Sequence, residues 1–477
     1  MQKLKLFVEN FFVYGLGGII SRLIPLILVP VIIRLFPDPA YYGLTDLSAT
    51  VIQFGSALAL MGMSDAMYRM FFEREDEAYK RSVCSTALLF TLFTSLFVFL
   101  VMLLFKEPIA AFFFGDRAYA YLVCITAVAT LVGATNNIVS APTRMQNKKK
   151  VYLTANILSP VLAYSLAIPL IQRGYYVIAL PLSMLAANLT IEVIFYAFNC
   201  RWFCIRKFDF KLLREMLAIA IPLMPNLLIY WVFNSSDRVM IANLAGTGAS
   251  GVYAVGAKLG HVSQLIYTAF AGGWQFFAFS TMREKDQVAS NSWIFEYLGI
   301  LSFIAGAFMC ALSGSIFRVL FTPDYREGYL VAPYLFLAPL LQMLFQVIGN
   351  QFLIIRKTWP VMVILLSGAA LNVVLNLWFI PRIGIEGAAI ATLTGYMVSN
   401  VIAVVVLRKM RLLDLSLRFC ACAGVMLVYF VAWRFIFSQS VEIGIVAAWN
   451  MMLVCVWFYR QDLRQLICVL SRAGKHG

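Results

Sequence analysis

Long runs of apolar residues, separated by short polar loops, fill the chain from residue 11 to residue 459. A helix rises about 1.5 Å per residue, so roughly 20 apolar residues cross a hydrocarbon core of about 30 Å. The pattern predicts an all-α, polytopic membrane protein with about fourteen transmembrane helices, and twelve or thirteen are the alternatives where boundaries are ambiguous. The predicted spans are residues 11–33, 44–70, 83–105, 118–141, 151–172, 175–198, 213–236, 250–279, 292–320, 329–355, 359–380, 385–407, 416–437 and 441–459.

An internal repeat organises these spans. Gly43 and Gly251, which follow the first and seventh spans, are 208 positions apart, and Gly174 and Gly384 are 210 positions apart. The chain therefore divides into a first six-helix lobe, a second six-helix lobe, and two additional helices with a cytoplasmic tail, at residues 1–210, 211–415 and 416–477. An even number of spans preserves orientation, so the two lobes are related by an axis along the membrane normal.

Polar side chains follow one face of several predicted spans. In the seventh span, Asn226, Tyr230, Asn234 and Asp237 are three or four residues apart and share a helical face. Similar stripes in the second and eighth spans comprise Asp46, Thr50, Gln53 and Ser64, and Tyr253, Lys258, His261, Gln264, Thr268 and Gln275. Because a charge that faces lipid is expensive, such stripes indicate a water-filled cleft between helices. A cleft between two repeated bundles is typical of alternating-access transporters.

Paired prolines interrupt the first and seventh spans, at Pro25 and Pro30 and at Pro222 and Pro225. Each proline removes a backbone donor and bends its helix. A static packing kink and a hinge both fit this pattern. The occurrence of a pair in each of two repeat-related helices favours the hinge.

Composition supports a membrane protein, and the distribution of charge gives its orientation. Hydrophobic residues make up 62% of the 477 residues, against about 45 to 50% in soluble domains, and the mean hydropathy is +0.84. The net charge of +15 is concentrated in alternate loops, so that predicted cytoplasmic segments carry about three times as many Lys and Arg residues as external ones. Both ends are therefore expected in the cytoplasm, with anionic lipid headgroups as neighbours and without nucleic acid as a partner.

The cysteines and the N-terminal segment add no further chemistry. The nine cysteines are scattered, and the close pairs Cys200 with Cys204 and Cys420 with Cys422 lack histidines or a second pair at metal-ligand spacing. We therefore expect packing cysteines, no metal and no cofactor. The first apolar run lacks a small-residue cleavage site, so it is expected to be a retained span rather than a signal peptide.

Several stretches resemble oligosaccharide flippases. They are DRVMIANLAGTGASGVYAVGAKL from Asp237, YTAFAGGWQFFAFS from Tyr267, GMSDAMYRMFFEREDEAYKRSVCSTAL from Gly62 and ALNVVLNLWFIPRIGIEGAAIAT from Ala370. Together with the division into six, six and two helices, they make the chain similar to the polysaccharide transporter branch of the multidrug, oligosaccharidyl-lipid and polysaccharide exporter superfamily. The resemblance extends over nearly the whole chain.

The resemblance implies a bacterial inner-membrane flippase with a central cavity that opens alternately to each side. Its substrate would be an undecaprenyl-pyrophosphate-linked oligosaccharide of the O-antigen or exopolysaccharide type, carried to the external leaflet for surface polysaccharide biosynthesis. The lipid-linked oligosaccharide and membrane lipids are the implied partners, and polysaccharide polymerase machinery is a candidate partner. Coupling to a proton or sodium gradient, or to membrane potential, is also implied.

The pyrophosphate of such a substrate needs basic groups inside the cleft, because moving a charge into a membrane costs several kcal/mol. Arg22 lies within the first span and matches in position an arginine of lipid-linked-saccharide flippases, and Lys258 lies in the eighth span. An ion pair with a nearby carboxylate, or snorkelling to the interface, is the alternative for each. Four further arginines lie near span ends, where snorkelling is the default: Arg69, Arg144, Arg238 and Arg356.

Sugars are held by amides, hydroxyl groups and aromatic faces, and ion coupling needs carboxylates within spans. The candidate sugar-contacting residues are Gln53, Asn226, Tyr230, Asn234, Gln264, Trp274 and Gln275. The alternative for an amide in a membrane helix is a bond to another helix, of about 0.6 kcal/mol. The candidates for ion coupling are Asp46, Glu192 and Asp237.

Two other function classes remain open at this point. A cation-coupled small-molecule antiporter of the multidrug type would favour an acidic, aromatic pocket, whereas Arg22 and Lys258 favour an anionic substrate. A membrane polysaccharide polymerase or ligase would need a sizeable external loop with acid, base or histidine groups. The predicted external loops are short, so no catalytic residue and no enzyme activity are expected.

Overall fold

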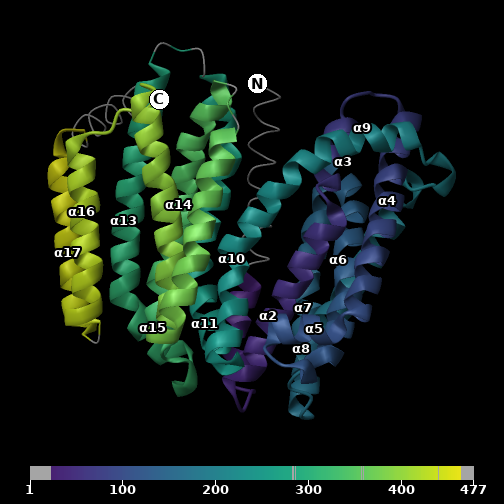
Figure 1. Ribbon diagram of the computed structural model, residues 1–477, viewed down its shortest axis with the longest axis horizontal. Coiled ribbons are helices and arrows are strands. Elements are labelled where there is room, and N and C mark those ends of the chain that lie inside the picture. The colour runs from purple at the N-terminus through teal and green to yellow at the C-terminus, as the bar shows by residue number, and fades with distance from the viewer. Residues whose placement is uncertain are drawn as a thin grey trace. The chain divides into compact units, whose positions relative to one another are not determined.

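The computed structural model describes residues 23–281, 284, 286–355, 357, 359–438 and 440–462, and within them the regular secondary structure is helical, without strands (Figure 1). Nine helices in this part of the chain are long and apolar enough to cross a membrane, or up to eleven if each of two bent pairs is one span. The predicted fold class, an all-α multi-pass membrane protein, is confirmed.

The predicted spans overlap the helices over the described residues, but the second, seventh and eighth predicted spans are each broken into two helices. The first half contains α2 (Pro39–Leu60), α3 (Met63–Phe71), α4 (Glu77–Leu104), α5 (Lys106–Phe114), α6 (Ala120–Met145), α7 (Lys149–Gln172) and α8 (Ala179–Asn199). It is followed by α9 (Phe210–Ala220), α10 (Met224–Ala245), α11 (Thr247–Gly260), α12 (Gln264–Ser280), α13 (Gln287–Leu320), α14 (Gly328–Ile354), α15 (Trp359–Lys409), α16 (Leu417–Ala432) and α17 (Val441–Phe458). The 51-residue α15 breaks at Ile383 and Gly384, where φ of Gly384 is +62°, so it corresponds to two predicted spans.

By packing, the chain forms two compact units. Unit 1 comprises residues 1–255 and 371–391, and unit 2 comprises residues 256–370 and 392–477. The predicted division at residues 210 and 415 follows the internal repeat rather than packing, and it stays a prediction.

Short polar side chains determine where several helices begin. The Asp38 carboxylate accepts a hydrogen bond from Ala40 N at 2.7 Å before Pro39 opens α2. Asp76 accepts from the first turn of α4, and Asp209 accepts from Lys211 N at 2.8 Å at the start of α9. Each cap satisfies backbone donors that a helix leaves without an internal partner, which contributes about 1 kcal/mol.

Two bent pairs of helices lie in unit 1. α2 and α3 meet at 50°, because Met61 and Gly62 adopt positive φ values of 48° and 78°. α9 and α10 meet at 47°, at the predicted proline pair Pro222 and Pro225. The two breaks touch, because a Cβ on Gly62 would lie 2.7 Å from the carbonyl oxygen of Ala220. The bend predicted at Pro222 and Pro225 is present, whereas residues 23–33, which contain Pro25 and Pro30, form one helix; a hinge role stays a prediction.

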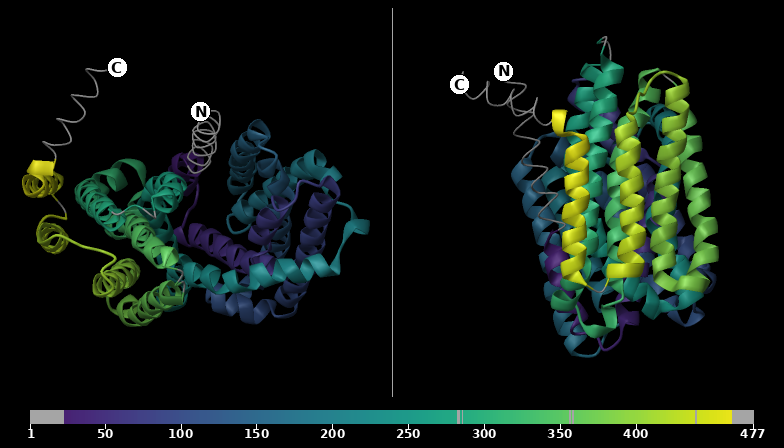
Figure 2. Two further views of the ribbon diagram at one scale, coloured as in Figure 1. Left: turned by 90° about the horizontal axis from the view of Figure 1, so that it is seen from above. Right: turned by 90° about the vertical axis from the view of Figure 1, so that its left-hand side faces the viewer.

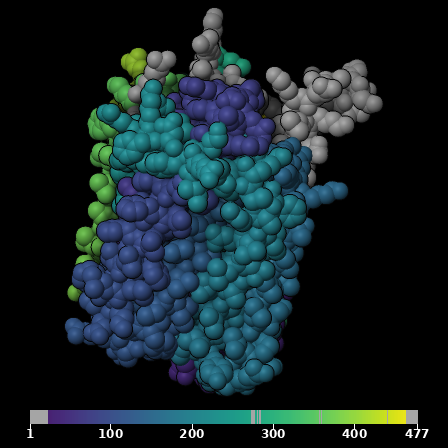
Figure 3. All heavy atoms as spheres, turned by 90° about the vertical axis from the view of Figure 1, so that its right-hand side faces the viewer, coloured from purple at the N-terminus to yellow at the C-terminus, as the bar shows by residue number. Residues whose placement is uncertain are grey.

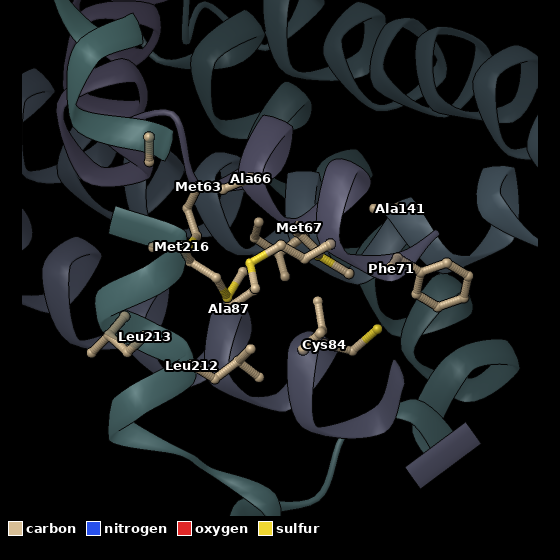
Figure 4. Close-up of a cluster of buried hydrophobic side chains, with 14 of the residues drawn as sticks. Met63, Ala66, Met67, Phe71, Cys84, Ala87, Ala141, Leu212, Leu213 and Met216 are labelled. Atoms are coloured by element: carbon tan, nitrogen blue, oxygen red, sulfur yellow. The ribbon is translucent and has the colours of Figure 1, made fainter. Parts of the chain in front are cut away.

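Beyond the breaks, α3 and α9 share a methionine-rich core with α4 and α6. Figure 4 shows Met63 and Met67 of α3 pointing toward Met216 of α9, with Leu212 and Cys84 alongside. Unbranched methionine side chains fill irregular gaps, which suits the packing of two short helices at an angle.

The segment between α8 and α9 is fixed to α4 by side-chain hydrogen bonds. The Ser85 hydroxyl donates to Trp202 O at 3.2 Å and accepts from Cys204 N at 2.9 Å. Thr86 Oγ1 accepts from Asp209 N at 3.1 Å. α9 is thereby held against the end of α4, and the space-filling view shows it across that end of the α4 surface (Figure 3).

In unit 2, one carboxylate joins α13 to the last two helices. Figure 2 shows α16 and α17 as neighbours, and both pack on α13. Glu296 of α13 is 4% exposed. It accepts hydrogen bonds from Ser416 N at 2.6 Å, from the Ser416 hydroxyl at 2.8 Å and from the Tyr459 hydroxyl at 2.8 Å.

We expect Glu296→Ala to lower the free energy of unfolding by about 3 kcal/mol, because it leaves the buried Tyr459 hydroxyl and the two partly buried Ser416 donors without their acceptor. Thermal unfolding of the purified protein in detergent measures the effect. Glu442→Ala, which removes an exposed acid from the first turn of α17, is the matched control. Equal melting temperatures for the two variants would contradict the prediction.

Candidate functional site

The most strongly charged interior position in unit 1 lies where α2, α10 and α11 meet. Arg238 Nε of α10 is 2.6 Å from Asp46 Oδ2 of α2. The adjacent Asp237 accepts a hydrogen bond from the Tyr253 hydroxyl of α11, and its Oδ1 accepts from Arg238 N at 2.8 Å. We call Asp46, Asp237, Arg238 and Tyr253 the charged cluster.

The charged cluster is almost completely removed from solvent. Asp46 is 8% exposed, Asp237 4% and Tyr253 0%, and the Arg238 side chain is 12% exposed. Arg238 also donates from Nη1 to Asn234 O at 2.6 Å, so backbone and carboxylate together position its guanidinium group. With two carboxylates for one guanidinium, the cluster has an excess of one acid. A proton or a monovalent cation is the chemical species that would balance it.

Aromatic packing positions α10 against α2 one to two turns from the charged cluster. Trp231 Nε1 donates to Thr50 O at 3.5 Å, and the Trp231 ring centroid is 4.6 Å from that of Phe54. Phe113 of α5 completes the group, with ring centroids 6.0 Å from Phe54 and 6.4 Å from Trp231. Large aromatic surfaces at this level fix the register that brings Arg238 to Asp46.

A backbone contact between α2 and α11 lies beside the charged cluster. A Cβ on Gly43 would collide with the carbonyl oxygen of Thr247, and one on Gly251 would collide with that of Pro39. These are the two glycines that define the predicted repeat, and in the structure they pack directly against each other. We call this contact the glycine clasp. Only glycine permits helix backbones to approach so closely.

The predicted anion-binding pair is only partly within the described residues. Arg22 lies outside them. Lys258 lies in α11 within unit 2, and its side chain is exposed. The proposal that Arg22 and Lys258 share one cleft stays a prediction.

The predicted sugar-contacting residues are distributed over three helices. Gln53 is exposed on α2, and Tyr230 and Asn234 are partly exposed on successive turns of α10, where Asn234 Nδ2 donates to Tyr230 O at 2.7 Å. In unit 2, Gln264 is partly exposed at the start of α12, whereas Trp274 is 4% exposed and stacks on Phe270 at 5.4 Å. The side chains of Asn226 and Gln275 lie outside the described part of the chain.

Of the three carboxylates predicted to couple ions, the structure brings two together. Asp46 and Asp237 both belong to the charged cluster. Glu192 lies elsewhere in unit 1, on α8 beside Thr135 of α6, and is partly buried. Within the described residues, no group of three or more His, Cys, Asp or Glu side chains could hold a metal ion.

Sequence reasoning did not assign Arg238 and Tyr253 to the site. Arg238 lies near the end of a predicted span, where snorkelling is the default for an arginine. The available signal was the acid–base dipeptide Asp237–Arg238 within an apolar run, because charged side chains within a membrane span generally face the bundle interior and pair with other charges.

The chain is similar to known proteins both in sequence, at the level of a family, and in fold. A profile of the family described as polysaccharide biosynthesis protein matches residues 31–329. No curated protein sequence matches the chain at a significant level. A solved structure of lipid II flippase MurJ, in an inward closed conformation, is 15% identical with a TM-score of 0.70, covering 96% of this chain and 99% of its own.

Two solved structures, each described as a conformation of a multidrug resistance MATE family transporter of the MOP superfamily, are also similar. The inward-facing structure is 14% identical with a TM-score of 0.63, over 83% of this chain and 98% of its own. The outward-facing structure is 15% identical with a TM-score of 0.58, over 85% of this chain and 95% of its own. At these identities the likeness shows a shared fold, which is that of transporters and flippases rather than enzymes.

Proposed function

Because the chain belongs to the polysaccharide biosynthesis protein family and has a MurJ-like and MATE-like transporter fold, we propose that it is a flippase for a lipid-linked oligosaccharide. The substrate is an oligosaccharide repeat unit on undecaprenyl pyrophosphate. It moves across the bacterial inner membrane toward surface polysaccharide biosynthesis. The observation that carries this proposal is the family match combined with a likeness to a lipid II flippase over 96% of the chain.

The charged cluster supports alternating access coupled to an ion. Its excess acid binds a proton or a cation in one state, and the ion pair between Asp46 and Arg238 joins α2 to α10 in another. The glycine clasp closes the same end of the bundle, which is the external end in the predicted topology. Opening this end requires both contacts to separate, so ion binding at Asp46 or Asp237 biases the equilibrium between the two states.

In this proposal, different predicted cavity residues bind the pyrophosphate and the sugars of the substrate. Arg22 and Lys258 stabilise the pyrophosphate, and the polar side chains of α2, α10 and α12 contact the sugars. Both termini lie in the cytoplasm, and membrane lipids surround the bundle. Polysaccharide polymerase machinery receives the product on the external side.

The second candidate function is a cation-coupled small-molecule antiporter. The MATE family likeness and the acidic excess of the charged cluster favour it. It differs from the flippase in its substrate, because a cationic drug is repelled by Arg22 and Lys258.

Depletion of the protein, with analysis of undecaprenyl-linked saccharides, tests the function. We expect an unpolymerised unit to accumulate on the cytoplasmic side, and Arg22→Ala and Lys258→Ala to reproduce part of that accumulation while Arg22→Lys does so less. If depletion leaves the amounts of undecaprenyl-linked saccharides unchanged but alters tolerance to cationic drugs, the flippase proposal is wrong and the antiporter is favoured.

A further inference from the structure

One arginine outside the charged cluster is held in an unusual environment at the other end of unit 1. Arg144 lies at the end of α6, with its guanidinium carbon 5.2 Å from the centre of the Tyr68 ring of α3 and 5.6 Å from that of Tyr152 of α7. Among the described residues, the other arginines in such contacts each face one ring. We call Arg144, Tyr68 and Tyr152 the arginine cage.

The arginine cage differs from an arginine that extends into solvent. Arg144 is partly buried, and its Nε atom is buried without a hydrogen-bond partner in the described part of the chain. Its carboxylate neighbour is Asp65 of α3, which is exposed. Contacts with two rings restrict the movement of the guanidinium group, so less entropy is lost when its remaining donors bind a ligand.

The turn beside the arginine cage is rigid and basic. Gln146 N, Asn147 N and Lys148 N donate to the last carbonyls of α6, each at 2.9 Å. Three consecutive lysines follow, at positions 148 to 150, and α7 begins at Lys149. Arg201 Nη2 donates to Gln146 Oε1 at 3.0 Å and adds a further positive charge. Asp65 is the acid that faces Arg144, so the basic side chains around this turn outnumber the acidic one. The excess of positive charge favours binding of an anion.

From this geometry we propose that the arginine cage and the adjoining lysines bind a phosphate group borne by a lipid. A planar, oriented guanidinium group binds two phosphate oxygens at once, and the lysines add point charges. The pyrophosphate of the carrier lipid is one source of that phosphate, and this assignment rests on the proposed function. A glycerophospholipid headgroup is the other source. In the predicted topology the site lies at the cytoplasmic end, where the proposed substrate is loaded.

Binding of undecaprenyl pyrophosphate to the purified protein in detergent, followed by native mass spectrometry, tests the proposal. We expect Arg144→Ala and Arg144→Lys to weaken binding at least tenfold, because lysine keeps the charge but loses the two-pronged geometry. Tyr68→Phe and Tyr152→Phe keep the ring faces and should bind as the wild-type protein does. Lys106→Ala, at an exposed basic position that opens α5, is the control for loss of one positive charge.

Wild-type affinity in Arg144→Lys, or equal affinities in Arg144→Ala and Lys106→Ala, would overturn the site. If Arg144→Ala does not fold, Tyr152→Leu replaces it, and affinity equal to that of Tyr152→Phe would be the contrary result. Competition by phosphatidylglycerol identifies a glycerophospholipid as the occupant, and its absence identifies the pyrophosphate. If the wild-type protein and the variants bind as expected but the wild-type protein does not translocate lipid-linked oligosaccharide, the proposed function is wrong and the proposed binding site still stands.

Discussion

The Arg238→Gln variant is expected to lose transport and to unfold at a lower temperature than the wild-type protein. Removing one partner of a buried ion pair leaves an uncompensated buried charge, which costs about 3–5 kcal/mol. Here the loss is aggravated because Asp46 and Asp237 both remain, so two buried carboxylates would share a site without a counter-ion. Thermal unfolding in detergent and accumulation of lipid-linked saccharide in cells measure the two effects.

A double variant separates stability from transport. Asp46→Asn with Arg238→Gln removes one charge of each sign, so we expect recovery of most of the lost melting temperature. Transport should stay lost, because the ion pair that closes one state is absent. The cluster would have no role in transport if the double variant transported normally. A double variant no more stable than Arg238→Gln would show that Asp46 is not the partner that matters.

Gly43→Ala is expected to prevent closure of the glycine clasp. A single methyl group at this position collides with backbone atoms of α11, and a backbone cannot move aside as a side chain does. Gly251→Ala should act in the same way, through Pro39. Gly248→Ala is the matched control on α11, because nothing lies within 4 Å of its added Cβ, and alanine there favours the helix by about 1 kcal/mol.

Cysteine labelling detects the opening directly. Ser250 is 0% exposed beside the clasp, so in a background without native cysteines Ser250→Cys should resist a membrane-impermeant maleimide added from outside. With Gly43→Ala we expect it to react, and with Gly248→Ala it should not. Protection of this cysteine in the Gly43→Ala variant would contradict the role of the clasp.

The span pattern could be predicted from sequence because length and hydropathy determine it locally. Pro222 and Pro225 likewise predict the bend between α9 and α10. The bend between α2 and α3 carries a weaker signal, because Gly62 alone suggests a break and Met61 is a residue type that seldom adopts a positive φ. Local sequence could not reveal that this break rests on Ala220.

The site was predicted in part, for a related reason. Asp46 and Asp237 are visible as carboxylates in apolar spans, and Gly43 and Gly251 are visible as repeat landmarks. Their partners are set by the packing of α2 against α10 and α11, which sequence spacing does not determine. Arg238 was therefore not assigned to the site, although its guanidinium group pairs with Asp46 and its backbone N–H donates to Asp237.

Glu296 links the last two helices to the rest of unit 2, so the stability of α13 depends on the presence of α16 and α17. A shortened chain that ended near residue 415 would leave this carboxylate without the donors that Ser416 and Tyr459 supply. We therefore expect a chain without α16 and α17 to be more stable when position 296 carries an uncharged residue.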